Sequence, residues 1–252
     1  MSETTNGGVR IHYEIEGSGP PLVLQHGFSQ SSADWRVAGY VEALREHHQV
    51  ILVDARGHGG SDKPHDGAAY SAAQHAADIV AVLDALGLQR ADYWGYSMGG
   101  WIGFGMARYA PQRLRALIPG GQHAYGRKVA PGLPDGRDPE LFFESFFSSI
   151  GLNFAALPAE QRKALLTVDT LALAVARQDR PSFEDSLPAM TMPALLYAGT
   201  RDGIFAQAEA SAKAMPHCTF VALAGLDHSD AFYKATAELV PKVLDFLQQA
   251  EA

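Results

Sequence analysis

The feature that most constrains this fold is the segment 91–101, in which one serine stands between two glycines. The segment reads ADYWGYSMGGW. Residues that favour strands lead to Gly95-x-Ser97-x-Gly99, and small residues typical of a closely packed helix follow. The spacing predicts a sharp turn from strand to helix that exposes the Ser97 hydroxyl above a sheet. Glycine suits the two flanking positions because a strained serine backbone leaves no room for side chains there.

Strand-like and helix-like segments alternate on both sides of this turn. A half-exposed strand is predicted at 9–16, and short apolar runs predict buried strands at 22–25, 50–54, 114–119, 194–199 and 218–223. Helical spacing is visible at about 42–46, 71–87, 206–214 and 231–249. This order indicates an α/β fold with a mostly parallel central sheet and helices on both faces.

The alternation stops between residues 121 and 188, where Pro, Gly and aromatic residues are frequent. We expect this stretch to be a small helical cap on a core made of residues 1–120 and 189–252. Helices are predicted at 139–147 and 165–177. The first presents a stripe of phenylalanines that either docks the cap on the core or lines a substrate cavity: Phe142, Phe143, Phe146 and Phe147. From it we take Phe142 and Phe146, together with Phe28, as candidate substrate contacts.

Composition excludes several classes of function. The chain has 252 residues, 47% of them hydrophobic, enough for a sizeable core in one domain. Its 20 basic and 28 acidic residues give a net charge of −8, and the absence of a basic run argues against nucleic acid or a membrane as partner. A single cysteine, Cys218, excludes an intramolecular disulfide and fits a reducing cytosol. With no leader-like start and no apolar stretch near the ~20 residues that span a bilayer, we expect a cytoplasmic protein. Nothing in the sequence indicates its oligomeric state.

A serine hydroxyl becomes a useful nucleophile only beside a base that a third group orients. Of the ten histidines, His228 directly follows the last predicted strand, at the carboxyl edge of the sheet, where ligands bind in open α/β folds. The histidines in polar loop or helix contexts are expected at the surface, and one other lies on an outer strand: His47, His48, His65, His75 and His12.

The orienting acid is expected at the same edge. Asp202 follows the penultimate strand, whereas Asp227 and Asp230 are too close to His228 in sequence to reach its ring easily. Strand 114–119 has no carboxylate after it before Asp135.

An oxyanion requires two N–H donors. Met98, directly after the serine, supplies one, and Phe28, in the loop after strand 22–25, is the candidate for the other. We expect His26 to tie that loop down rather than to take part in chemistry.

Five ordered motifs carry a family resemblance: HGF at 26–28, DARGHGGSD at 54–62, GYSMGG at 95–100, GTRD at 199–202 and GLDHS at 225–229. With them the chain resembles the α/β-hydrolase superfamily over essentially its whole length. It looks most like the small carboxylesterases, enol-lactonases and cofactor-free haloperoxidase-like members. The resemblance implies a triad of Ser97, Asp202 and His228, in the chain order of that superfamily. The 54–62 motif is a hallmark that we interpret as structural.

The resemblance implies hydrolysis of a small carboxylic ester or lactone through an acyl-enzyme. Ser97 stands where related dehalogenases and epoxide hydrolases carry an aspartate. No metal cluster and no dinucleotide-type glycine pattern is present, so no cofactor is expected. Alternatives are a carbon–carbon bond hydrolase with the same triad, a perhydrolase or haloperoxidase-like enzyme in which peroxide replaces water, and a ligand sensor that retains the triad. The identity and chain length of the substrate are not indicated.

Overall fold

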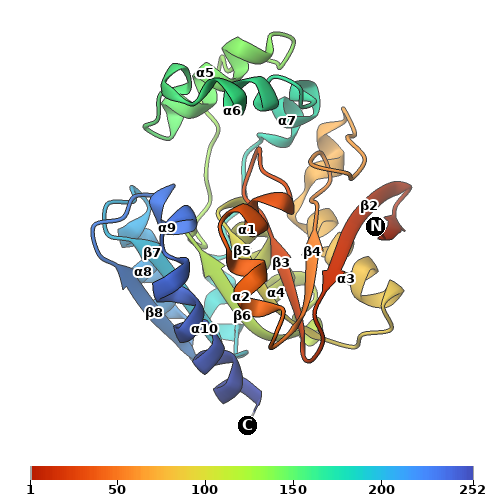
Figure 1. Ribbon diagram of the computed structural model, residues 1–252, viewed down its shortest axis with the longest axis vertical. Coiled ribbons are helices and arrows are strands. Elements are labelled where there is room, and N and C mark those ends of the chain that lie inside the picture. Colours follow the sequence, from red (N-terminus) through yellow and green to blue (C-terminus); the bar gives the residue numbers. More distant parts are fainter. Residues whose placement is uncertain (1, 252) are drawn as a thin grey trace.

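A computed structural model describes residues 2–251 as an eight-stranded sheet with helices on both faces and a helical layer above one edge (Figure 1). The strand order is β1-β2-β4-β3-β5-β6-β7-β8. The strands are β1 Ser2–Asn6, β2 Val9–Glu16, β3 Pro21–Gln25, β4 Gln49–Val53, β5 Ala91–Tyr96, β6 Leu114–Gly120, β7 Ala194–Gly199 and β8 Cys218–Leu223. Only β1–β2 and β2–β4 pair antiparallel. The predicted α/β fold with a mostly parallel sheet is confirmed.

Two hydrophobic clusters sandwich the sheet. On one face lie α3 Ala72–Ala85, α4 Met98–Tyr109 and α8 Phe205–Ala214; on the other lie α1 Ala33–Val37, α2 Tyr40–Leu44, α9 Asp230–Tyr233 and α10 Thr236–Glu251. The central strand β5 shows why both faces of the sheet are covered. Its Tyr93 belongs to the first cluster and its Trp94 to the second. Because successive side chains of a strand point to opposite faces, a strand apolar on both must be covered twice.

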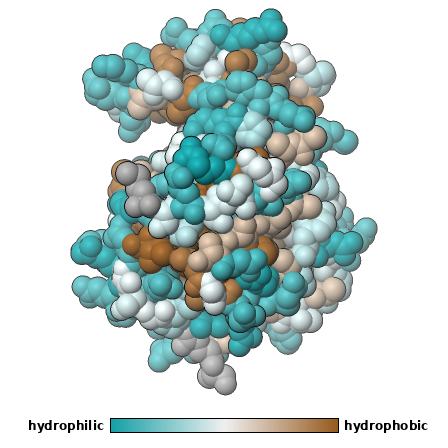
Figure 2. Space-filling view, turned by 90° about the vertical axis from the view of Figure 1, so that its right-hand side faces the viewer, coloured by the Kyte–Doolittle hydropathy of each residue, from teal (hydrophilic) through white to brown (hydrophobic). Residues whose placement is uncertain are grey.

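A cap of helices from the segment between β6 and β7 lies above the carboxyl edge of the sheet (Figure 1). It holds α5 Pro139–Ser149, the short helix η3 Phe154–Ala156, α6 Ala159–Leu165 and α7 Thr170–Ala176. Side-chain contacts tie it to the loop after β4: His65 pairs with Asp169 at 2.9 Å, and Gln178 Nε2 donates to the Gly67 carbonyl at 2.8 Å. Figure 2 shows the cap as an upper lobe with a hollow between it and the core. No helix within residues 2–251 has the length and apolarity needed to cross a membrane.

Several helix and strand boundaries differ from the predictions. Strand β1 and helix α1 were not predicted. The helix predicted at 165–177 is interrupted, because the Asp169 side chain accepts the Ala172 N–H and starts α7 afresh at Thr170. The helix predicted at 231–249 is likewise divided into α9 and α10. In each case a local cap or break overrides an apolar spacing that looks continuous.

Two histidines predicted at the surface, His48 and His75, are buried. His75 lies on the face of α3 that packs against α4, with its ring 5.7 Å from that of Trp101. Burial lowers its pKa well below the usual value, and the Arg56 charge adds to this, so the ring is neutral. His12 is also buried and contacts Asp54 through Nδ1 at 2.9 Å.

The phenylalanine stripe is divided between an apolar core within the cap and a contact with Phe28 in the loop after β3. Phe142, Phe143 and Phe147 pack with Phe154 and Leu173 into a separate small core of the cap. Phe142 is 0% exposed, so its prediction as a substrate contact is wrong: the cap needs an apolar interior of its own, and this ring fills it. The fourth ring, Phe146, is half-buried and lies 5.0 Å from the ring of Phe28.

A buried ion pair joins the segment after β4 to α3. Arg56 donates from Nε and Nη2 to the two oxygens of Asp78, at 2.7 and 2.5 Å. We expect Asp78→Ala to lower the free energy of unfolding by about 3–5 kcal/mol, because it leaves a buried guanidinium uncompensated. Urea denaturation measures this. The control is Asp84→Ala, which removes the exposed partner of Arg113 and should cost about 0–1 kcal/mol. Equal losses would contradict the ranking.

Candidate active site

The turn between β5 and α4 holds Ser97 in a strained conformation. Its φ of 52° and ψ of −110° lie where residues with a side chain are rarely found. Two backbone bonds hold the strain: the Ser97 N–H donates to the Gly120 carbonyl at 2.8 Å, and the Trp101 N–H donates to the Ser97 carbonyl at 3.0 Å. Gln122 Nε2 also donates to that carbonyl, at 3.0 Å.

The flanking glycines are required by close backbone approach. A Cβ at Gly95 would lie 2.2 Å from the Gly99 carbonyl oxygen, and a Cβ at Gly99 would lie 2.1 Å from the carbonyl oxygen of Gln25. Neither neighbour is a flexible side chain that could move aside. The turn therefore forms only with glycine at both positions.

The structure brings together the three side chains predicted as nucleophile, acid and base. Ser97 follows β5, Asp202 follows β7 and His228 follows β8, so all three lie at the carboxyl edge of the sheet. His228 Nε2 is 3.0 Å from Ser97 Oγ, and its Nδ1 is 2.6 Å from Asp202 Oδ2. Because a carboxylate only accepts, Nδ1 is assigned the ring proton and Nε2 is left to accept from the serine.

The competing acid is engaged elsewhere. Asp227 Oδ1 accepts the N–H of Asp230 at 2.8 Å. Asp202 is buried, and its other oxygen accepts the Ile204 N–H at 3.2 Å, which orients the carboxylate toward the ring.

A residue not singled out from the sequence completes this arrangement. The Tyr96 hydroxyl donates to the His228 carbonyl at 2.5 Å, and the two rings are 5.4 Å apart. Burial raises the Tyr96 pKa well above its usual value, so the hydroxyl remains a donor. Its place directly before the serine was the one available signal.

The predicted oxyanion donors lie on either side of Ser97 in the chain. Met98 is the first residue of α4, where an N–H has no partner within the helix. Phe28 lies in the loop after β3. Among residues 2–251, neither backbone N–H donates a hydrogen bond, so both remain available to a ligand.

Hydrogen bonds of His26 and Gln30 fix the loop that carries Phe28. His26 Nε2 accepts the Ala55 N–H at 3.0 Å, and Nδ1 donates to the Gly27 carbonyl at 2.7 Å. Gln30 Oε1 accepts the Gly27 N–H at 2.8 Å. His26 is fully buried and has no ring nitrogen left for chemistry, as its structural interpretation requires.

The 54–62 segment braces the same region. Asp54 accepts the N–H groups of Ser32 and Gly60, at 2.7 and 2.8 Å. His58 lies with its ring 5.5 Å from that of Phe28. Burial, followed by the neighbouring His26, lowers the His58 pKa to about 3, so it forms a neutral wall.

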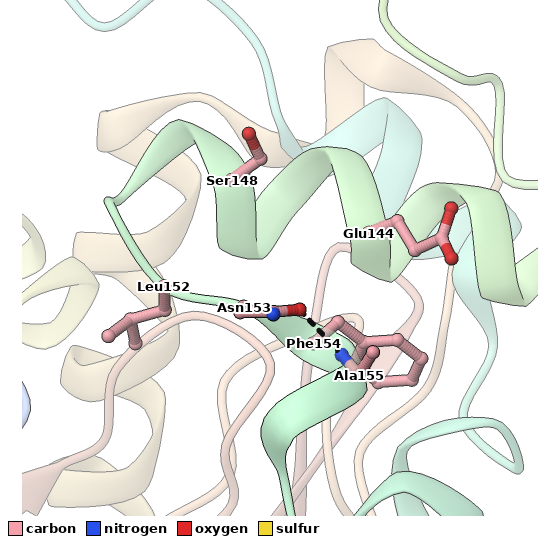
Figure 3. A pocket seen from close by; sticks show the side chains of 6 residues that line it. All are labelled: Glu144, Ser148, Leu152, Asn153, Phe154 and Ala155. Carbon is pink, nitrogen blue, oxygen red and sulfur yellow. Dashed lines mark hydrogen bonds between the residues drawn. The ribbon is translucent and has the colours of Figure 1, made fainter.

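A cavity of about 350 Å³ lies apart from these residues, between α5 and η3 of the cap (Figure 3). It is lined by Glu144, Ser148, Leu152, Asn153, Phe154 and Ala155. The Asn153 side-chain oxygen is occupied by the Ala155 N–H at 3.0 Å, and among the described side chains no hydrogen bond joins Ser148 to Glu144. Within residues 2–251, no group of three or more His, Cys, Asp or Glu side chains is arranged to hold a metal.

Known proteins are similar to this chain in sequence. The family model described as alpha/beta hydrolase fold matches residues 20–123. The 2-hydroxymuconate semialdehyde hydrolase of Pseudomonas sp. (strain CF600) is 32% identical over 218 residues, which cover 85% of this chain and 72% of that protein. The chain spans less than half the length of the first curated relatives it matches.

Solved structures extend the likeness to the whole fold. A hydrolase from Pseudomonas aeruginosa PA01 superposes with a TM-score of 0.82 at 26% identity, covering 98% of this chain and 97% of its own. The enol-lactonase from Burkholderia xenovorans LB400 also gives 0.82, at 24% identity, covering 98% and 100%.

We expect the reactivity of Ser97 to depend on the contact between His228 and Asp202. We expect Asp202→Asn to slow labelling of Ser97 by a fluorophosphonate by about 10³-fold or more, because the amide stabilises the wrong histidine tautomer. Asp227→Asn should label at close to the wild-type rate, and Ser97→Ala should not label. Loss of labelling in Asp227→Asn alone would identify the other carboxylate as the acid. Gel-based labelling time courses measure the rates.

Proposed function

We propose that this chain, which belongs to the α/β-hydrolase family, hydrolyses a small carboxylic ester or lactone through an acyl-enzyme formed on Ser97. Membership of the family makes it a hydrolase of the α/β fold. The choice of reaction rests on one observation, the continuous contact from Ser97 Oγ through the His228 ring to Asp202. That contact supports the assignment of these three side chains as the catalytic triad.

In the first half-reaction, Ser97 Oγ attacks the substrate carbonyl while its proton passes to His228 Nε2. Asp202 keeps the ring oriented and stabilises the imidazolium that forms. The developing oxyanion accepts hydrogen bonds from the N–H groups of Met98 and Phe28. In such sites each donor stabilises the transition state by about 3 kcal/mol. His228 then gives its proton to the leaving oxygen, and the acyl group remains on the serine.

In the second half-reaction, water enters where the alcohol left. His228 Nε2 takes a proton from the water, and the resulting hydroxide attacks the acyl carbonyl within the same oxyanion site. The tetrahedral intermediate collapses, the proton returns to Ser97 Oγ, and the free acid departs. The Tyr96 bond to the His228 carbonyl supports this assignment, because it restrains the histidine that must serve both steps. Phe28 and Phe146 are proposed to contact the apolar part of the substrate.

The nucleophile argues against epoxide or haloalkane chemistry. Branches of the family that cleave those bonds attack through an aspartate at this turn. Here the residue is Ser97.

One second candidate has support from a particular comparison. A relative that covers 85% of this chain is named for hydrolysis of 2-hydroxymuconate semialdehyde, a compound whose name contains no ester. Carbon–carbon bond hydrolysis of a vinylogous diketone by the same triad is therefore the alternative. Both reactions use the same serine, histidine and oxyanion site.

We expect the purified protein to hydrolyse p-nitrophenyl esters of short acids or simple lactones, and Ser97→Ala to lower kcat by at least about 10³-fold. Product release across acyl chains of rising length measures this, with circular dichroism to verify that the variant is folded. Full activity in Ser97→Ala would refute the serine. Turnover of a vinylogous diketone in the absence of ester turnover would favour the second candidate.

A further inference from the structure

Two arginines face each other where the chain enters and leaves the cap. Arg127, in the segment after β6, and Arg180, in the segment after α7, form an antiparallel bridge: each N–H donates to the other's carbonyl, at 3.0 and 2.8 Å. In a pair of this kind both side chains project from the same face, with Cα atoms about 5.5 Å apart. Like charges in directly opposed positions destabilise a pair, so this arrangement has a cost.

A third arginine joins them. Arg177 is half-buried; its Nη2 donates to Ser149 Oγ at 2.9 Å, while its buried Nη1 has no hydrogen-bond partner among the described residues. Within residues 2–251, no carboxylate pairs with Arg127, Arg177 or Arg180. Elsewhere in this acidic chain, arginines with a carboxylate partner are common: Arg10, Arg36, Arg45, Arg56, Arg113, Arg115 and Arg137.

At the neighbouring positions of the same bridge, by contrast, a cation is paired with a carboxylate. Lys128 pairs with Asp179 at 2.7 Å, and Asp179 also accepts the N–H of Val129 at 2.9 Å. These side chains follow and precede the arginines by one residue, so they belong to the other face of the bridge. Charge is balanced on one face and unbalanced on the other.

The electrostatic state of the three arginines agrees with this. Burial lowers the pKa of Arg180 to about 9, and the Arg127 charge lowers it further. Arg127 is exposed to solvent over much of its surface, and partial desolvation lowers its pKa; burial lowers the pKa of the half-buried Arg177, with a contribution from Arg127. Each guanidinium lies near other cations and lacks a counter-charge, a situation that an anion would relieve.

Two of the three arginines pack against aromatic rings of residues near the proposed catalytic residues. The Arg180 guanidinium stacks 4.8 Å from the ring centre of Trp101, one turn along α4 from Ser97. The Arg177 guanidinium is 5.5 Å from the ring of Phe146, which in turn contacts Phe28. Arg180 thus contacts the residue whose backbone N–H donates to the Ser97 carbonyl, and Arg177 contacts the ring that packs against Phe28.

His123 links the two groups electrostatically. Burial lowers its pKa; Arg127 and Arg180 lower it further, and Asp202 opposes them. His123 therefore lies within electrostatic range of Arg127, Arg180 and the proposed triad acid Asp202.

We propose that Arg127, Arg177 and Arg180 bind a carboxylate carried by the substrate, so that the enzyme selects anionic esters or lactones whose acid group lies several bonds from the scissile carbonyl. This rests on the proposed function. Guanidinium groups offer paired donors that match the two oxygens of a carboxylate. The net charge of −8 would repel such a substrate from the rest of the surface, so a local cationic site is needed to hold it.

The test compares monomethyl and dimethyl esters of glutarate, adipate and suberate, with methanol release followed by NMR. Each monomethyl ester carries one carboxylate where the diester is neutral. We expect the best monoester to exceed its diester in kcat/KM per ester group by about tenfold or more, the range of a charge-assisted hydrogen bond. Arg180→Gln and Arg127→Gln should each lower that ratio several-fold to about tenfold, and Arg180→Lys should recover part of it.

The matched control is Lys128→Gln, which removes a cation one residue away on the balanced face and should leave the ratio unchanged. A second arm does not need catalysis: monomethyl adipate titrated calorimetrically into Ser97→Ala should bind at least about tenfold more tightly than into Ser97→Ala/Arg180→Gln. Equal ratios in wild type and arginine variants, or equal binding in this arm, would overturn the anion site. Arginine-dependent binding without ester turnover would instead overturn the proposed function and leave the anion site standing.

Discussion

The position of the nucleophile depends on the close approach of three backbone segments at the Ser97 turn. β3, β5 and the first turn of α4 approach so closely that Gly95 and Gly99 have no room for a Cβ beside the carbonyls of Gly99 and Gln25. The serine between them has a φ of 52°, a strain that persists because bonds to Gly120 and Trp101 hold both sides of the turn. A serine held in this way above the sheet places its hydroxyl within reach of His228 and beside the first N–H of the helix.

The other reacting groups come from the parallel sheet rather than from the turn. Strands β7 and β8 end at the same edge as β5, and the residues just past those ends are Asp202 and His228. Because these strands end at one edge, His228 lies 2.6 Å from Asp202 Oδ2 through Nδ1 and 3.0 Å from Ser97 Oγ through Nε2. Tyr96 connects the two parts, since it belongs to the strand that carries the serine and donates to the backbone of the histidine.

The triad residues could be predicted from the sequence because each directly follows a strand. A strand end followed by a chemical residue is local in sequence, so Ser97, Asp202 and His228 could each be placed at one edge before the structure was known. Burial by residues distant in sequence is not local: His48 and His75 look like surface residues, and Phe142 like a cavity residue, until their neighbours are placed. The pairing of Arg127 with Arg180 is the extreme case, because it joins residues from opposite ends of a cap without strand periodicity. No spacing rule could have brought them together.

The central claim is that Ser97 becomes acylated. The chain offers a direct test, because trypsin releases residues 91–108, a peptide with one serine, after Arg90 and Arg108. Protein mixed with a p-nitrophenyl ester and quenched in acid within the first turnover should yield this peptide carrying the acyl group on Ser97 by tandem mass spectrometry. An unmodified peptide during steady turnover, or the acyl group on another residue, would contradict the account.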